Sequence, residues 1–406
     1  MMKKIGLKIS IGIFAYGVFF NNPFFLKNTE KAILGIFLYS IPLIVNLLKK
    51  PGELTKVYSI WFGIFMILQS LLFFKIFNTD YVTLPPNLVE KVDVKEGVLS
   101  NIKGIQNIKT DEKGFRVTKK INYENKPDNN YRIFAIGGST TEQIYLDQNL
   151  SWTHLLQEKL DQKYQDLNFE VINTGVSGLR ANNHIATLKK ILKYNPDMAI
   201  FLIGINDWNR DIKRNHKSGY KKFKKNLPDF MTGLSYNKTL RKFTKSLKKK
   251  MQNNSNNNKE LKEIYFAYGS LNKDDKRSYR PQNVLDSYKK ELNEIDSICK
   301  KNQIKCVFLT QPNGYKELAS KQYKDLFWMT PPGEEYTLKF EDMSYISNLY
   351  NEYMIDFAKN SKNQICDLNS KIPASLDYMY DDCHFNIKGA KKVSDILFDC
   401  IDIDQN

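Results

Sequence analysis

The sequence predicts an α/β fold in which a mostly parallel sheet is covered by helices on both faces. Three observations support this: short apolar runs, amphipathic helical segments between them, and the regular alternation of the two. The expected strands are "YRIFAI" (131–136), "FEVINT" (169–174), "MAIFLI" (198–203), "IKCVFLT" (304–310) and "QICDL" (364–368). The expected helices lie near 150–164, 180–193, 283–300, 341–360 and 387–400. Ligands of such sheets bind beyond the carboxyl ends of the strands, where functional residues are therefore expected.

Residues 1–78 contain three apolar runs and predict a membrane anchor of about three transmembrane helices. Residues 32–48 and 57–74 contain no charged side chain, and each run is close to the ~20 residues that cross a bilayer. The first run, near 9–20, is shorter and is followed by Asn21, Asn22 and Pro23, so a signal peptide is its alternative interpretation. A third span is preferred because no small-residue cleavage site follows the run.

The lysines beside these runs predict the orientation of the anchor. Cytoplasmic flanks of membrane spans are enriched in Lys and Arg. Six lysines flank one side, namely Lys3, Lys4, Lys8, Lys49, Lys50 and Lys56, and two flank the other, Lys27 and Lys31. Three crossings then place the amino terminus in the cytoplasm and the remainder of the chain outside a bacterial-type inner membrane. If the first run does not cross, this placement inverts.

Two further regions flank or interrupt the α/β pattern. Residues 79–130 are polar and are expected to form a linker or irregular cap before the 131–406 domain. A basic insertion is expected at 210–281, and its first part, 210–250, carries fifteen basic and two acidic residues. Its basic face suits anionic lipid or glycan, with a solvated basic loop as the alternative. Nucleic acid is not expected as a partner, because the predicted compartment is wrong and no recognised binding module is present.

The five cysteines all lie in the last third of the chain and do not form a metal-binding pattern. No Cys-x-x-Cys pair and no histidine cluster accompanies them, so neither zinc nor a cofactor is expected. Outside the cytoplasm some could form disulfides, but an odd count leaves at least one unpaired, and the spacing assigns no pairs. Cys306, inside an apolar strand, is interpreted as a core residue. His154 and His184, in helical segments, and His216, in the basic insertion, are expected at the surface. Trp152, Trp208 and Trp328 are expected to be packed in the core or partly buried, with the lining of a sugar-binding cleft as the alternative.

Ser139 follows the first expected strand in the stretch "RIFAIGGSTTEQ" (132–143). The stretch lacks the Gly-x-x-x-x-Gly-Lys-Ser/Thr spacing of a phosphate-binding loop. Taken alone, it is compatible with a simple helix cap, because a hydroxyl at a helix start accepts hydrogen bonds from unpaired amides. The interpretation of Ser139 therefore depends on the residues at the other strand ends.

Three later motifs supply what a nucleophilic serine requires. They are Asn173-x-Gly175-x-x-Gly178, Gly204-x-Asn206-Asp207 and Asp381-x-x-His384. A serine hydroxyl needs a base, the base needs an orienting partner, and the developing oxyanion needs donors. His384 can act as the base and Asp381 as its partner. Asn206 and the backbone at Gly178 can supply donors.

Together with Gly137-Gly138-Ser139-Thr140, these motifs resemble the four blocks of the SGNH (GDSL-type) hydrolases, in the same order. The resemblance implies a three-layer α/β/α flavodoxin-like domain and esterase or acyl-transfer chemistry. It implies Ser139 as nucleophile, an Asp381–His384 pair, and an oxyanion hole formed by Gly178, Asn206 and the Ser139 amide. Asp382 is the alternative partner of the histidine. The family's usual Gly-Asp-Ser is Gly-Gly-Ser here, so a carboxylate beside the nucleophile is missing.

The resulting hypothesis is a membrane-anchored serine esterase that hydrolyses acyl esters, above all O-acetyl esters, of a cell-surface polysaccharide or glycolipid. One alternative is an O-acyltransferase, in which a sugar hydroxyl replaces water as the acyl acceptor. A second is a non-catalytic glycan-binding protein that keeps the fold. The intact Ser139, Asp381 and His384 favour an enzyme.

Overall fold

The computed structural model describes residues 80–215, 274–327 and 336–403. The predicted membrane spans and the greater part of the basic insertion lie outside these residues, as do His216 and Trp328. Among the residues that are described, no helix is both long enough and apolar enough to cross a membrane.

Five parallel strands form the central sheet in the order β4–β3–β5–β7–β9. The strands are β3 (Asn130–Gly137), β4 (Asn168–Asn173), β5 (Met198–Leu202), β7 (Lys305–Leu309) and β9 (Gln364–Cys366). Each lies within two residues of an apolar run predicted from the sequence, and the prediction of a parallel α/β fold is confirmed. The chain first adds β4 on one side of β3 and then β5 on the other. In α/β sheets ligands bind where the strand order reverses in this way, which here is at the carboxyl ends of β3 and β5.

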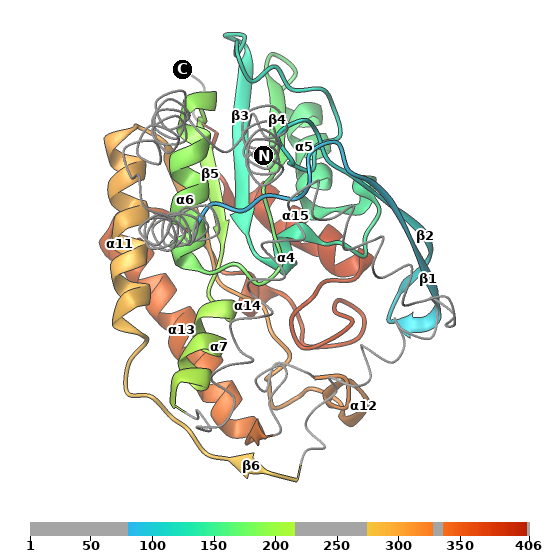
Figure 1. Cartoon of the computed structure of the whole chain (residues 1–406), viewed down its shortest axis with the longest axis vertical. Helices are drawn as coiled ribbons and strands as arrows, with labels where there is room; N and C mark the ends of the chain where they lie inside the picture. Colours follow the sequence, from blue (N-terminus) through green and yellow to red (C-terminus); the bar gives the residue numbers. More distant parts are fainter. Residues whose placement is uncertain (1–79, 216–273, 328–335, 404–406) are drawn as a thin grey trace, which may run out of the picture. The chain divides into compact units, whose positions relative to one another are not determined.

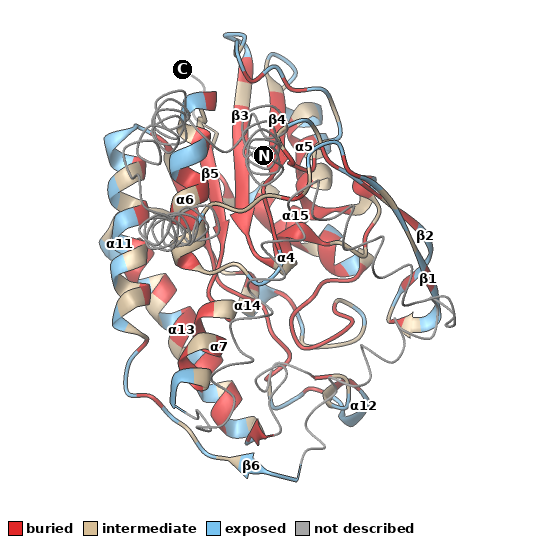
Figure 2. Ribbon diagram, viewed as in Figure 1, coloured by how far each residue is buried: buried red, intermediate tan, exposed pale blue. Residues whose placement is uncertain are grey.

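Helices cover both faces of the sheet (Figure 1). On one face α5 (Trp152–Lys163) packs against α15 (Ile387–Cys400). On the other lie α6 (Ala181–Ile191), α11 (Asp286–Lys301) and α13 (Phe340–Asn360). Figure 2 shows that the buried residues gather in the strands and on the helix faces turned toward them. Trp152 and Trp208 are fully buried there, as predicted.

The segment 79–130 is more regular than the sequence suggested. It contains an antiparallel hairpin formed by β1 (Val89–Leu99) and β2 (Ile102–Lys109). The hairpin was missed because charged side chains occupy many of its exposed positions, which makes the segment polar overall. On β2, Gln106 and Ile108 are buried while their neighbours are more exposed. Asp147 accepts hydrogen bonds from the Asn107 amide groups at 2.7 and 3.0 Å and so anchors the hairpin to the domain.

The first residues of the predicted basic insertion belong to a helix of the domain. Residues 210–215 complete α7 (Ile205–Asn215), and Asp211 and Ile212 are buried in it. Beyond the undescribed residues the chain returns beside the same helix. There the Tyr279 hydroxyl donates to Asp211 Oδ1 at 2.8 Å, and Asn215 Nδ2 donates to the Tyr279 hydroxyl at 2.6 Å. The two ends of the segment are therefore joined to each other.

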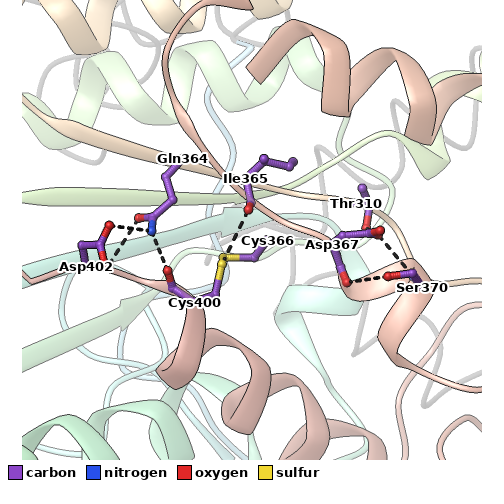
Figure 3. Close-up of a disulfide and its surroundings, with 8 residues drawn as sticks. All are labelled: Thr310, Gln364, Ile365, Cys366, Asp367, Ser370, Cys400 and Asp402. Atoms are coloured by element: carbon purple, nitrogen blue, oxygen red, sulfur yellow. Dashed lines mark hydrogen bonds between the residues drawn. A yellow bond between two sulfur atoms is a disulfide. The ribbon is translucent and has the colours of Figure 1, made fainter. Parts of the chain in front are cut away.

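Four of the five cysteines form two disulfides, Cys299–Cys306 and Cys366–Cys400. Cys306 is buried as predicted, but it is also bonded to Cys299 of α11. Figure 3 shows the second disulfide, which ties β9 to the end of α15. Beside it, Gln364 Nε2 donates to the Cys400 carbonyl at 2.5 Å. Cys383 is unbonded and buried.

The two disulfides should differ in their contribution to stability. Cys366–Cys400 closes a loop with a sequence separation of 34, against 7 for Cys299–Cys306. Chain-entropy arguments then predict a loss of about 4 kcal/mol in unfolding free energy when the first pair is replaced by alanines, and about 2.5 kcal/mol for the second. Denaturant unfolding of the two double variants measures this. Equal losses, or a larger loss for Cys299 and Cys306, would contradict the loop-length argument.

Candidate active site

Ser139 lies just beyond the carboxyl end of β3, an interior strand of the sheet. It is the first residue of the short helix α4 (Ser139–Glu142), directly after Gly137 and Gly138. A Cβ on Gly137 would lie 2.7 Å from the Leu202 carbonyl oxygen of β5, so the tight exit from the strand requires glycine. The Glu142 amide donates to the Gly138 carbonyl at 2.9 Å and closes the turn of α4. The serine is thereby held, half-buried, at the carboxyl edge of the sheet.

His384 contacts both Ser139 and Asp381. Its Nε2 lies 2.7 Å from Ser139 Oγ, and its Nδ1 lies 2.7 Å from Asp381 Oδ2. Asp381 Oδ1 also accepts hydrogen bonds from the backbone amides of Cys383 and His384, at 3.0 and 2.7 Å. The imidazole stacks on the Tyr380 ring at 5.5 Å between centroids. The structure thus brings the three predicted side chains together and holds the imidazole at both nitrogens.

The electrostatics of this pair follow from burial and mutual attraction. Burial favours the neutral form of Asp381, but the charge of His384 and the hydrogen bonds to the carboxylate outweigh it, so the pKa of Asp381 is lowered. Burial alone would lower the pKa of His384. The charge and hydrogen bond of Asp381, with smaller contributions from Asp382 and Glu142, outweigh burial and raise that pKa above 6.5. The pair is arranged to stabilise an imidazolium.

Asp382, the alternative partner, points elsewhere. Its Oδ2 accepts a hydrogen bond of 2.5 Å from the Tyr315 hydroxyl, and its backbone carbonyl accepts one of 2.8 Å from the Gly314 amide. Asp382 therefore attaches this loop to the segment after β7, while Asp381 contacts the imidazole.

One cluster among the described residues has the side-chain types of a metal site. Ligand atoms of Asp381, Cys383 and His384 lie within 4.8 Å of one another. The Asp381–His384 hydrogen bond already occupies two of these groups. Burial, reinforced by the neighbouring carboxylates, raises the pKa of the Cys383 thiol well above 9.0, so the thiolate that metals bind is disfavoured. The geometry suits a hydrogen-bonded acid–base pair better than a metal centre.

Of the remaining predicted residues, Asn206 and Asn173 contact the turn and helix that carry Ser139, and Gly178 lies in the loop after β4. Asn206 Nδ2 donates to the Leu179 carbonyl at 2.8 Å and lies against Gly138. Gly178 adopts a φ of +78° at the tip of the loop after β4, where a Cβ would meet no atom within 4 Å. Asn173 supports this loop, because its Nδ2 donates to the Thr141 carbonyl at 2.6 Å and its Oδ1 accepts from the Gly175 amide at 2.9 Å.

Gly138 stands where the family's usual Gly-Asp-Ser has aspartate, and the structure shows that a side chain at this position would be crowded. A Cβ added to Gly138 would lie 2.8 Å from Asn206 Nδ2, which is shorter than a normal contact. An aspartate at this position would require the Asn206 amide to move. Glycine at 138 thus leaves room for the amide beside the nucleophile.

Two buried residues of the site were not predicted. Glu142 accepts hydrogen bonds from the backbone amide and hydroxyl of Ser177. Arg116 donates to the carbonyls of Glu142, Gln143 and Leu146 and holds the chain that follows α4. Burial lowers the pKa of Arg116 to about 10. Neither residue belongs to a recognisable motif, so only the fold reveals them.

One histidine prediction was wrong. His184 is 1% exposed inside α6, not on its surface, and burial lowers its pKa to about 3. The helix carries its apolar residues on the same side, and the neutral imidazole packs with them. His154 is half-buried, and its Nδ1 lies 3.0 Å from the Thr118 hydroxyl.

Comparison with known proteins gives a family match. The model of the GDSL-like Lipase/Acylhydrolase family matches residues 135–392. No curated protein sequence matches the chain.

Several solved structures are similar at low identity. The acetyl xylan esterase AlAXEase is 15% identical, with 66% of this chain and 99% of that chain covered and a TM-score of 0.38. Axe2, an acetylxylan esterase from Geobacillus stearothermophilus, is 12% identical, with 68% of this chain and 95% of that chain covered and a TM-score of 0.38. LAE5, an α/β hydrolase enzyme from the metagenome of Lake Arreo, Spain, is 14% identical, with 70% of this chain and 100% of that chain covered and a TM-score of 0.37.

The two neighbouring aspartates should respond differently to substitution. Asp381→Asn removes the group that raises the pKa of His384, so kcat should fall by about 10⁴-fold and the acid limb of kcat/KM should move to lower pH. Asp382→Asn keeps an acceptor for the Tyr315 hydroxyl and should retain most activity, while unfolding free energy falls by about 1–2 kcal/mol. pH–rate profiles with an ester substrate and denaturant unfolding measure both effects. A larger loss of activity in Asp382→Asn would reverse the assignment.

Proposed function

The chain belongs to the GDSL-like lipase/acylhydrolase family and hydrolyses ester bonds, and on this premise we propose a serine mechanism carried by Ser139, His384 and Asp381. The observation that carries the proposal is the pair of contacts made by one imidazole. His384 Nε2 lies 2.7 Å from Ser139 Oγ, and Nδ1 lies 2.7 Å from Asp381 Oδ2. A neutral imidazole with Nδ1–H directed at Asp381 leaves the Nε2 lone pair directed at the serine hydroxyl.

In the proposed reaction Ser139 Oγ attacks the ester carbonyl carbon while its proton passes to His384 Nε2. The C–O bond to the alcohol then breaks as His384 returns the proton to the leaving alkoxide. Water, deprotonated by the same imidazole, attacks the acyl-serine and releases the carboxylic acid. Asp381 remains ionised throughout and stabilises the imidazolium formed in both steps.

The oxyanion is proposed to bind the amides of Ser139 and Gly178 and the Asn206 side chain. Support comes from the placement of Asn206 beside Gly138 and from the exposure of Gly178, where an added Cβ would meet no atom within 4 Å. Loss of one such donor typically costs about 3–4 kcal/mol in transition-state stabilisation. In the absence of ligand, Asn206 Nδ2 donates to the Leu179 carbonyl, which keeps the amide oriented.

The proposed substrates are acyl esters, above all O-acetyl esters, of a surface polysaccharide or glycolipid, with the domain tethered outside the inner membrane. The apolar runs 32–48 and 57–74 support the tether. The two disulfides support an oxidising compartment, because cytosolic thiols are normally kept reduced. A tethered enzyme in that compartment meets the esters of envelope glycans.

Replacement of the nucleophile tests the mechanism. With p-nitrophenyl acetate and the full chain in detergent, Ser139→Ala should lower kcat by about 10⁴-fold or more, because no acyl-enzyme can form. Ser361→Ala, at the far end of α13, is the matched control and should keep the wild-type rate. Equal turnover by Ser139→Ala and wild type would refute the serine mechanism.

The products made from acetylated glycans test the acceptor. Free acetate is expected when acetylated polysaccharide is the substrate. Acetyl recovered on an added acceptor sugar, in place of free acetate, would show that a sugar hydroxyl replaces water.

The position of the enzyme relative to the membrane can be measured separately. A reporter that is active only outside the cytoplasm, fused after residue 80, should be active, because three spans place this point beyond the membrane. Activity only from a cytoplasmic reporter fused at the same point would overturn the proposed orientation.

A further inference from the structure

A buried carboxylate joins the nucleophile helix to the loop that carries Gly178. Glu142 is the last residue of α4, three positions after Ser139, and is 2% exposed. Its Oε2 accepts a 2.6 Å hydrogen bond from the Ser177 backbone amide and a second from the Ser177 hydroxyl. Both donors belong to the residue directly before Gly178. One acceptor therefore holds the backbone on which the proposed oxyanion donor depends.

The tip of this loop has few other attachments among the described residues. The base of the loop is well held, because the Thr174 and Val176 amides donate to the carbonyls of Ala135 and Gly137 at 2.9 and 3.2 Å. At the tip, Ser177 and Gly178 are exposed, and no atom lies within 4 Å of where a Gly178 side chain would begin. On the other side of Gly178, the Leu179 carbonyl accepts a 2.8 Å hydrogen bond from Asn206 Nδ2. The Gly178 amide therefore lies between two attachments, one through Ser177 and one through Leu179.

Glu142 is itself rigidly placed. A Cβ on Gly175 would lie 2.3 Å from the Glu142 amide nitrogen, so helix and loop are in direct backbone contact. Arg116 donates to the Glu142 carbonyl from the other side. Burial raises the pKa of the Glu142 carboxyl, against the hydrogen bonds from Ser177 and the charges of Arg116 and His384, which favour the carboxylate. A carboxylate fixed in this way can transmit the position of α4, and hence of Ser139, to the loop.

We propose that Glu142 is a positioning residue that sets the Gly178 amide relative to Ser139, so that nucleophile and oxyanion donor keep one geometry. The inference rests on the serine mechanism proposed above. Glu142 does not touch the reacting atoms, and acts through Ser177. A helix and a loop that could otherwise shift independently are joined at the point where misplacement of about 1 Å is costly.

The test compares two replacements of Glu142 in the full chain. Glu142→Leu removes the acceptor at similar size and should lower kcat for p-nitrophenyl acetate by about 10- to 100-fold, less than the ~10²–10³ expected for outright loss of a donor. KM should stay within about twofold. Glu142→Gln keeps an acceptor oxygen and should restore kcat to within about fivefold of wild type. Glu317→Leu, at an exposed position, is the control for replacing glutamate by leucine.

A thionoester substrate separates positioning from general damage. Sulfur in place of the carbonyl oxygen is a poor acceptor for oxyanion-hole donors, so the preference for the oxygen ester reports on those donors. The ratio of kcat/KM for the oxygen ester to kcat/KM for the thionoester should fall at least fivefold in Glu142→Leu. Equal losses for both substrates would overturn the inference, because a purely structural defect slows both alike.

Ser177→Ala removes one of the two donors at an exposed position, where folding is not at risk. It should lower kcat by about threefold to tenfold and shift the substrate preference in the same direction. If Glu142→Leu does not fold, an unchanged preference in Ser177→Ala overturns the inference. The serine mechanism is judged separately, because its failure would appear as an active Ser139→Ala.

Discussion

The hydrogen bond between Ser139 Oγ and His384 Nε2 joins residues 245 positions apart in the sequence. The contact therefore depends on the tertiary arrangement of the strands and helices that carry the two residues. The serine follows β3, which lies between β4 and β5, and the histidine precedes α15, which packs against α5 and contacts β9. The folded arrangement of these elements brings the two side chains together. The contact also needs a buried Asp381, whose charge is tolerated because two backbone amides and the imidazole bind it. The hydrogen bonds that make the buried Asp381 charge tolerable in the fold are therefore also those that orient the His384 imidazole toward Ser139.

Much of the fold could be predicted because buried parallel strands need nearly continuous apolar residues, and such runs are visible in the sequence. Ser139 and His384 were predictable as a pair because each stands in a motif at a strand end or before a helix. The β1–β2 hairpin was not predictable, because charged side chains cover its exposed face. His184 was misjudged because a histidine in an amphipathic helix can face either way, and packing decides which.

Glu142 and Arg116 show a further limit of sequence reasoning. A glutamate in the first turn of a short helix is ordinary, and its role depends on Ser177, which the loop after β4 brings to it. Arg116 lies in a polar segment, yet its guanidinium is buried against three carbonyl groups. Such residues are defined by what tertiary structure places beside them. At Gly138 it is the lack of a side chain that matters. The Asn206 amide occupies the space that a side chain at this position would need.

The link between Tyr279, Asp211 and Asn215 has a consequence for how this domain can vary. The chain leaves α7 and returns to it at the same place, so the two ends of the departing segment are fixed to each other. A change in the length or charge of that segment need not alter the strand register or the distance between Ser139 and His384. Evolution can therefore change the length and composition of this lysine-rich segment while the hydrolytic residues keep their positions.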